Sequence, residues 1–315
     1  MRLNSYFLWL PCRSMSLRTL LCVSLLLLSA CKEQVNVTSG AAKDFGKPLV
    51  LASNYPLYFF ASQIAGDAVE IRMPEMDGDP AMWWPSSPDL SLMQNADLII
   101  LNGAAYESWL AFTSIPAGLT VDTTTDIQDR LLPIENVTLH QHGPEGEHSH
   151  EATAFTTWLD PNMAIEQARV IARELSLLVP AQAEGFAERL ARLEEKLTAL
   201  DQSLESAFLK LDGQPIVFSH PVFQYLQHRY GLNGQSVHWE PDTEPGVKQW
   251  VDFQNLLREH QAKLMIWEGQ PSQVMIERLQ QQGIRSVIFD PVANRPASSD
   301  YFGVMKANLV QLENE

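Results

Sequence analysis

The chain has 315 residues, of which 45% are hydrophobic, and its 22 basic residues stand against 38 acidic ones, a formal net charge of −16. So acidic a composition excludes nucleic acid as a partner, because phosphates reward a basic surface. The length is enough for one large domain or two medium-sized ones, each with its own core.

The first residues have the pattern of a secretory signal peptide. Basic residues come first, an apolar run follows over 20–28, and small residues precede Cys31. The run is shorter than the roughly 20 residues of a membrane-spanning helix. The sequence Leu28-Ser29-Ala30-Cys31 looks like a bacterial lipobox, whose cysteine is acylated and becomes the first residue after cleavage. We therefore predict a signal peptide over 1–30, starting at Met1 or Met15, and a lipid anchor on Cys31.

The processed chain has to be stabilised without disulfides. Its three cysteines, Cys12, Cys22 and Cys31, all lie in the signal or at its end. Residues 1–30 carry three arginines and no acidic residue, so the formal charge without them is −19. Residues 31–47 are polar and aperiodic, which indicates a flexible tether between the lipid and the folded protein.

Residues 48–180 alternate between short apolar runs and helical patterns, which predicts βαβ units and a mainly parallel sheet. Strands are expected at 49–53, 69–73 and 98–101, and helices at 57–65, 90–95 and 161–178. Asp160 is the expected N-cap of the last helix, because Pro161 follows it at the first helical position.

A low-complexity segment interrupts this half at 138–152. It is acidic and holds four of the eight histidines, His140, His142, His148 and His150. Such a composition is typical of a mobile loop. Concentrated histidine with interleaved acidic residues favours weak, labile zinc capture over a merely charged insertion.

The longest helical pattern covers residues 181–212. Leucines recur along it at spacings of three and four, at Leu190, Leu193, Leu197, Leu200 and Leu204. A helix of this length spans about 45 Å. We therefore predict a connecting helix between an N-terminal lobe, 48–180, and a C-terminal lobe, 213–315. A coiled coil with a partner chain is the alternative, although the leucine stripe is too short to require one.

The C-terminal half repeats the strand and helix rhythm, and each of its clearest strands ends at a potential metal ligand. The strands are expected at 216–219, 263–267 and 285–289, and the ligands that follow them are His220, Glu268 and Asp290. Open α/β sheets bind ligands at the carboxyl ends of their strands, so these side chains are candidates for one shared crevice. Imidazole with carboxylates suits zinc or manganese.

Several motifs, in this order along the chain, resemble those of the zinc- and manganese-specific solute-binding lipoproteins of ABC importers, the cluster A-I metal receptors. The segment 79–89, DPAMWWPSSPD, is similar to the family's Asp-Pro-His motif. The others are Trp158-Leu159-Asp160-Pro161, Phe218-Ser219-His220, Glu244-Pro245-Gly246 and Phe289-Asp290-Pro291. The resemblance covers nearly the whole chain after the tether.

The resemblance implies an α/β fold of two lobes, each with a mainly parallel sheet flanked by helices, joined by one long rigid helix. It implies a metal held in the cleft between the lobes and delivered to a membrane permease, with no catalysis. A histidine-rich loop before Trp158 is also a habit of the zinc-specific members.

Two of the histidines that the resemblance implies are missing. Ala81 and Thr156 stand at their positions, and only His220 and Asp290 keep the pattern. An alanine has no donor atom, and a neutral hydroxyl is a poor donor to zinc. Two ligands are too few for a closed zinc site, which normally has four.

Other residues could compensate for the loss. Glu268 and Glu240 offer carboxylates, His238 offers an imidazole, and Met82 offers a thioether that prefers softer ions. The histidines of 138–152 could also fold in. Trp83 and Trp84, in contrast, could fill the cavity, pack as core, or form an apolar pocket for an organic ligand or a metal chelate.

The sequence thus predicts a monomeric receptor, lipid-anchored in the periplasm or cell envelope, that carries a divalent metal, with zinc favoured, to an ABC importer permease. The alternative is a diverged binding module of the same fold that has lost cleft metal binding and serves another solute, a chelate or a partner protein. No Gly-x-Ser-x-Gly, phosphate-binding glycine loop or His-Glu-x-x-His motif is present, so an enzyme such as a metallohydrolase is disfavoured.

Overall fold

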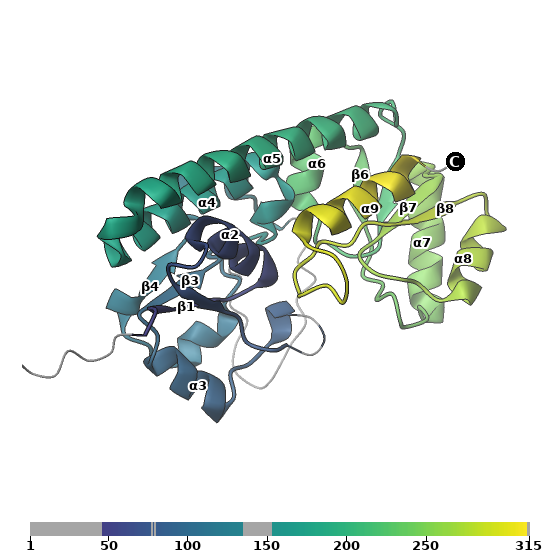
Figure 1. Cartoon of the computed structure of the whole chain (residues 1–315). Coiled ribbons are helices and arrows are strands. Elements are labelled where there is room, and N and C mark those ends of the chain that lie inside the picture. The colour runs from purple at the N-terminus through teal and green to yellow at the C-terminus, as the bar shows by residue number, and fades with distance from the viewer. Residues whose placement is uncertain (1–45, 77, 79, 135–152, 314–315) are drawn as a thin grey trace, which may run out of the picture. The chain divides into compact units, whose positions relative to one another are not determined.

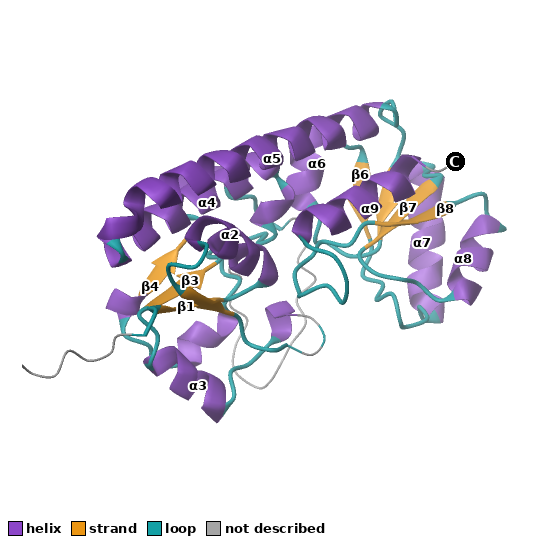
Figure 2. Ribbon diagram, in the orientation of Figure 1, coloured by secondary structure: helices purple, strands orange, loops and turns teal. Residues whose placement is uncertain are grey.

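Two parallel β-sheets with helices packed against them form the folded part of the chain (Figures 1 and 2). The computed structural model describes residues 46–76, 78, 80–134 and 153–313. Cys31 and the histidines of 138–152 lie outside the described residues. The alternation of strand and helix patterns predicted this α/β class correctly.

The first sheet has the strand order β2-β1-β3-β4, and all its neighbours pair in parallel. Its strands are β1 (Leu49–Ala52), β2 (Glu70–Arg72), β3 (Leu98–Leu101) and β4 (Thr120–Asp122). The two central strands read LVLA and LIIL and are almost wholly buried, as expected for strands covered on both faces. Strand β4 was not predicted, because Thr-Val-Asp is short and only half buried.

Helices cover both faces of this sheet. They are α2 (Tyr55–Ala65), α3 (Ser87–Gln94) and α4 (Pro161–Leu178), with the short 3₁₀ turns η1 (Pro80–Met82), η2 (Ser108–Phe112), η3 (Ala117–Leu119), η4 (Thr125–Arg130), η5 (Thr157–Leu159) and η6 (Pro180–Gln182). The predicted cap of α4 is present, since Asp160 Oδ1 accepts a hydrogen bond of 2.8 Å from the Asn162 amide.

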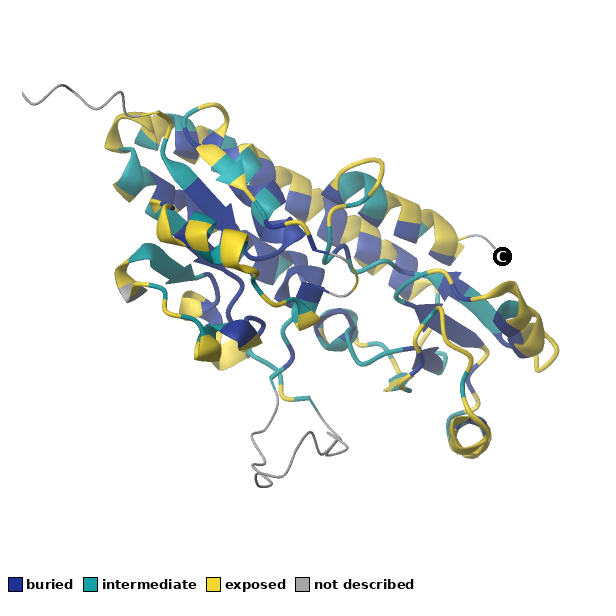
Figure 3. Ribbon diagram, turned by 90° about the horizontal axis from the view of Figure 1, so that it is seen from below, coloured by how far each residue is buried: buried dark blue, intermediate teal, exposed yellow. Residues whose placement is uncertain are grey.

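The long helix α5 (Ala183–Leu209) lies along both halves of the molecule. It packs against α2 and α4 beside the first sheet and against α6 and α9 beside the second (Figure 1). Leu193, Leu197, Leu200 and Leu204 of the predicted stripe are buried. The opposite face of α5 is exposed (Figure 3), as expected for an amphipathic helix.

The second sheet repeats the topology of the first, with the order β6-β5-β7-β8 and parallel pairing throughout. Its strands are β5 (Ile216–Phe218), β6 (Gly234–Ser236), β7 (Leu264–Trp267) and β8 (Arg285–Ile288), and its helices are α6 (Gln224–Tyr230), α7 (Val247–His260), α8 (Gln273–Gln280) and α9 (Tyr301–Glu313). Strand β6 reads Gly-Gln-Ser and has no strand signal. A Cβ at Gly234 would collide with the Phe218 ring, so glycine is needed at this close approach.

Side chains alternate between two cores on the faces of the second sheet. Phe218, Ile266 and Val287 point into the main core, which they share with α5 and α9. Val217 and Met265, one residue earlier in their strands, point into a separate core under α7 and α8. This alternation decides which residues beyond the strand ends share a face.

Hydrogen bonds connect segments near the two sheets. The Trp158 indole donates to the Pro291 carbonyl over 2.7 Å, and the Tyr301 hydroxyl donates to the Trp158 carbonyl over 3.0 Å. The Tyr55 amide donates to the Ala293 carbonyl over 3.2 Å. Within the described chain, no helix combines the length and apolarity that a membrane crossing requires.

A buried carboxyl organises the carboxyl edge of the first sheet. Glu107 accepts hydrogen bonds from the backbone amides of Asn102, over 2.6 Å, and Gly103, over 3.1 Å. Burial raises the pKa of Glu107 from 4.5 to about 7, even though these bonds and one from Ser53 favour the charged form.

This carboxyl should make stability fall as the pH rises. Between pH 4.5 and 7 the folded chain holds a proton on Glu107 that the unfolded chain has lost, so the stabilisation is complete at low pH and is lost through pH 7. The loss amounts to about 3 kcal/mol. Urea unfolding of wild type and Glu107→Gln across this range should give a smaller decline for the variant, because an amide does not titrate. Parallel curves would contradict the assignment, and the exposed Glu277→Gln serves as a control with the wild-type slope.

Candidate metal site

Three side chains named as ligand candidates from the sequence meet at the carboxyl edge of the second sheet. His220, Glu240 and Glu268 each offer a ligand atom, and these atoms lie within 4.8 Å of one another. His220 Nδ1 is 3.3 Å from a Glu240 oxygen and 3.5 Å from a Glu268 oxygen. Among the described residues, this is the one group of three or more histidine, cysteine or acidic side chains with such spacing.

Strand geometry explains why His220 and Glu268 meet. The β5–β7 ladder continues past Phe218, because the Ser219 amide donates to the Ile266 carbonyl over 2.9 Å. The Ser219 hydroxyl then accepts from the Glu268 amide over 3.3 Å. His220 and Glu268 follow Phe218 and Ile266 by two residues each, so they project from the same face of the sheet.

The two glutamates share a local sequence, because each directly follows a buried tryptophan. Trp239 and Trp267 are 2% and 1% exposed and pack in the core under α7 and α8. Their ring centroids are 6.2 Å apart, and the Trp239 ring is 4.8 Å from that of Trp250. With the indoles fixed in the core, the next residues, Glu240 and Glu268, are directed to the opposite face.

The site is half open to solvent and contains an unsatisfied polar atom. The side chains of Glu268 and His220 are 21% and 28% exposed, whereas Glu240 is 56% exposed. His220 Nδ1 is buried and makes no hydrogen bond, which is uncommon for a buried polar atom. Two carboxylates and an imidazole nitrogen at this spacing form a donor set that a metal cation between them stabilises.

Asp290, the third predicted ligand, is not part of this group. Its Oδ1 accepts a hydrogen bond of 2.7 Å from the Val292 amide, and burial raises the pKa of the carboxyl above its usual range. In β8 the residue that follows Val287 by two positions is Phe289, which is buried in the main core. Asp290 is therefore out of phase with Glu268, and its role as a ligand stays a prediction.

The two positions without the expected histidines have other contacts. Thr156 is 3% exposed, and its hydroxyl donates to the Val222 carbonyl over 2.6 Å. Ala81 lies in η1, and its neighbour Met82 is 74% exposed. Thr156 thus forms a hydrogen bond to the segment just beyond His220.

The two tryptophans after Met82 differ in their packing. Trp83 packs edge-on against Trp109, with 5.8 Å between ring centroids, in the core under the first sheet. Trp84 is 54% exposed and contacts Phe112, which is itself 76% exposed. Trp83 therefore packs against the core, whereas Trp84 and Phe112 form an exposed apolar patch.

His238 lies beside the group of three. Its ring centroid is 5.6 Å from that of His220, with an angle of 75° between the ring planes, and the residue is exposed. The histidines of 138–152, which were predicted as auxiliary ligands, lie outside the described residues.

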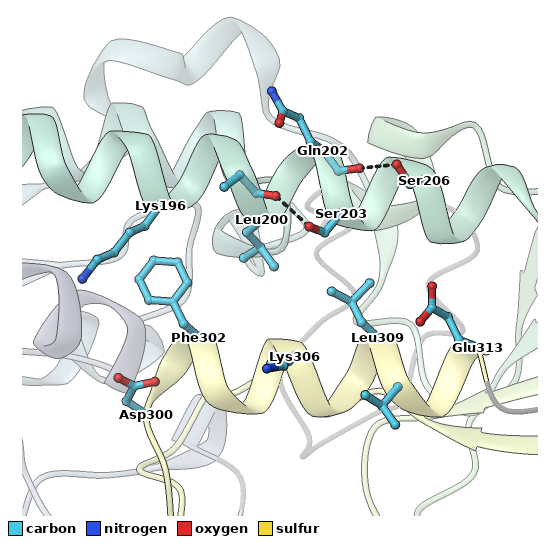
Figure 4. A pocket seen from close by; sticks show the side chains of 12 residues that line it. Lys196, Leu200, Gln202, Ser203, Ser206, Asp300, Phe302, Lys306, Leu309 and Glu313 are labelled. Atoms are coloured by element: carbon cyan, nitrogen blue, oxygen red, sulfur yellow. Dashed lines mark hydrogen bonds between the residues drawn. The ribbon is translucent and has the colours of Figure 1, made fainter.

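A separate groove of about 960 Å³ lies between α5 and α9 (Figure 4). Leu200 of α5 points toward Phe302 and Leu309 of α9. The Ser203 and Ser206 hydroxyls donate to carbonyls of their own helix, and the Lys196 ammonium is 5.9 Å from the Phe302 ring centroid. The groove contains none of the metal-site residues.

Comparisons with known proteins identify relatives that are named for zinc. Residues 50–315 match the family described as ZnuA, zinc-uptake complex component A, periplasmic. The zinc-binding lipoprotein AdcA of Streptococcus pneumoniae is 28% identical over 305 residues, which are 92% of this chain and 60% of that protein. The chain therefore spans about 60% of the length of this relative. The high-affinity zinc uptake system protein ZnuA of Bacillus subtilis is 25% identical over 311 residues, 92% of this chain and 93% of that one.

Solved structures share the fold. The metal-dependent lipoprotein YcdH from Bacillus subtilis superposes with a TM-score of 0.72 and 22% identity, covering 84% of this chain and 98% of that one. The Zn(II)-bound ZnuA-like domain of Streptococcus pneumoniae AdcA gives a TM-score of 0.70 at 23% identity, covering 85% and 98%.

Proposed function

Because the chain belongs to the family of the periplasmic zinc-uptake component A, we propose that it is an extracytoplasmic receptor that captures zinc and delivers it to an ABC importer permease. The family consists of metal-binding receptors and not of enzymes, in line with the prediction that the chain catalyses nothing. Zinc is the cargo of such a receptor, so it has to be both bound and released.

The observation that carries this proposal is the group of His220, Glu240 and Glu268. One imidazole nitrogen and two carboxylates lie within 4.8 Å of one another, and the nitrogen makes no hydrogen bond. Zinc accepts this set of nitrogen and oxygen donors. The half-open position of Glu240 suits a site that must release its cargo.

The predicted lipid anchor and tether determine where the receptor would work. A lipid on Cys31 and a tether over 31–47 would hold the folded protein within reach of a permease, and AdcA, a relative, is itself named a lipoprotein. We further propose that residues 48–180 and 213–315 act as the two lobes of a monomeric receptor, with 181–212 as the connecting helix. The formal charge of −19 without the signal peptide favours approach of a cation.

A second candidate function rests on the exposed apolar patch formed by Trp84 and Phe112. Their ring centroids are 5.2 Å apart and the residues are 54% and 76% exposed, and clustered apolar exposure is typical of interaction surfaces. A diverged module that binds an apolar solute, a chelate or a partner protein would use this patch and leave the carboxylates without metal.

This proposal predicts that zinc binding depends on the sheet-edge group, which consists of His220, Glu240 and Glu268 at the carboxyl edge of the second sheet. Calorimetric titration of the chain without its signal and lipid should give one saturable site. His220→Ala and Glu268→Gln should each weaken it at least tenfold, since removing even an outer-shell partner of a ligand costs roughly 10–100-fold. His228→Ala and Glu277→Gln, exposed residues outside the group, are the matched controls. A wild type without a saturable zinc site would refute the proposal.

The next prediction distinguishes the sheet-edge group from two other possible sources of metal ligands, the histidine-rich segment and Asp290. Deletion of residues 138–152 should remove only weak, additional zinc binding and leave the saturable site intact. Asp290→Asn should leave it unchanged as well, because an asparagine oxygen can still accept from the Val292 amide. If the deletion alone abolishes binding, the metal site is the histidine-rich segment. If Asp290→Asn does so, Asp290 is a ligand and the site differs from the sheet-edge group.

A further inference from the structure

We propose that His238 is a fourth protein ligand, so that the second sheet alone supplies the whole coordination set. The proposal rests on the metal-receptor function proposed above and specifies its site. The resulting set would be two imidazoles and two carboxylates, from His220, His238, Glu240 and Glu268. Four protein ligands are the usual number for a closed zinc site.

The first argument is the way in which the side chains that follow β6 alternate between the two faces of the sheet. The ladder with β5 continues beyond Ser236, since the Val237 amide donates to the Phe218 carbonyl over 2.9 Å and the Trp239 amide to the Ser219 carbonyl over 2.7 Å. Val237 and Trp239 both pack against the core under α7 and α8. In an extended chain His238 and Glu240 therefore project from the opposite face, where His220 and Glu268 lie.

The second argument is the distance between the two imidazoles. Their ring centroids are 5.6 Å apart. Two imidazoles bound to one tetrahedral zinc at about 2 Å have centroids roughly 5 Å apart. His238 is exposed, and its carbonyl accepts a hydrogen bond of 3.2 Å from Gln249 Nε2. His238 is not part of the group whose ligand atoms lie within 4.8 Å of one another, so its side chain must turn toward that group to complete the set.

The third argument is that the N-terminal half of the chain offers no nitrogen ligand at positions 81 and 156. The Ala81 side chain has no donor atom, and the Thr156 hydroxyl donates to the Val222 carbonyl. Neither position supplies the nitrogen that a zinc site of this kind needs. His238 supplies that nitrogen from the sheet that already holds the other three ligands, so binding does not require a ligand from both halves of the molecule.

The test compares His238→Ala with wild type, using Zn²⁺ in calorimetry and Co²⁺ as a spectroscopic probe of ligand number. Four-coordinate Co²⁺ absorbs visible light far more strongly than six-coordinate Co²⁺. We expect the variant to bind one ion at least tenfold more weakly and to lose much of the visible absorption, while His228→Ala stays like wild type. If His238→Ala matches wild type in both measurements, His238 is not a ligand, although the receptor function stands. If wild type itself has no zinc site, the receptor function fails first.

A measurement on the wild type removes any dependence on how the variant folds. Diethyl pyrocarbonate modifies accessible imidazoles, and mass spectrometry assigns the modified residue. Without metal we expect His238 and His228 to be labelled, because both are exposed. With saturating Zn²⁺, His238 should be protected and His228 should stay labelled. Equal labelling of His238 with and without Zn²⁺ overturns the proposal.

Discussion

The packing of Trp239 and Trp267 under the second sheet determines which side chains meet at the carboxyl edge of that sheet. Large buried aromatic side chains contribute much of the stability of a core, and here each one immediately precedes a glutamate. Since side chains alternate in extended chain, burial of the two indoles directs Glu240 and Glu268 to the opposite face, beside His220. Two carboxylates this close repel each other in the absence of a cation. The aromatic core thus holds a charge arrangement that a bound cation stabilises.

The hydrogen bonds of the folded chain change the interpretation of Ala81 and Thr156. They stand where the resemblance to metal receptors implies histidines, so the sequence alone presents them as lost ligands. In the folded chain Thr156 is buried and hydrogen-bonded to the Val222 carbonyl, two residues beyond His220. Nearby, Trp158 donates to Pro291 and Tyr301 donates to Trp158. A protein hydrogen bond therefore joins Thr156, where the resemblance implies a metal ligand, to the segment just beyond His220.

Much of this arrangement could be predicted from sequence, and the failures have physical causes. Apolar runs identified β1, β3, β5 and β7, because strands covered on both faces are continuously apolar. The edge strand β8 was predicted as well, although it begins with Arg285 and Ser286 and is mostly half-buried. Strands β4 and β6 are polar edge strands whose pairing is set by their neighbours, so no local signal marks them. His220 and Glu268 follow from the rule that ligands gather at strand ends. Glu240 follows a strand that was not predicted, and the Trp-Glu dipeptide that it shares with Glu268 is the sequence signal that indicates its orientation. Asp290 also ends a strand, but Phe289 takes the position in phase with Glu268.

The exposure gradient across the site bears on how a bound ion would leave it. His220 and Glu268 are the inner members of the proposed ligand set, 28% and 21% exposed, and lie just beyond the paired residues of the central strands β5 and β7. Glu240 is 56% exposed and His238 is exposed, and both lie beyond the edge strand β6. An ion in this site would lose its outer donors first, because their side chains can turn into solvent without disturbing the core. A partner that offers donors from the open side could then take up the ion stepwise. Capture and release of the ion would therefore depend on the carboxyl edge of one sheet, and the two halves of the molecule would not need to separate.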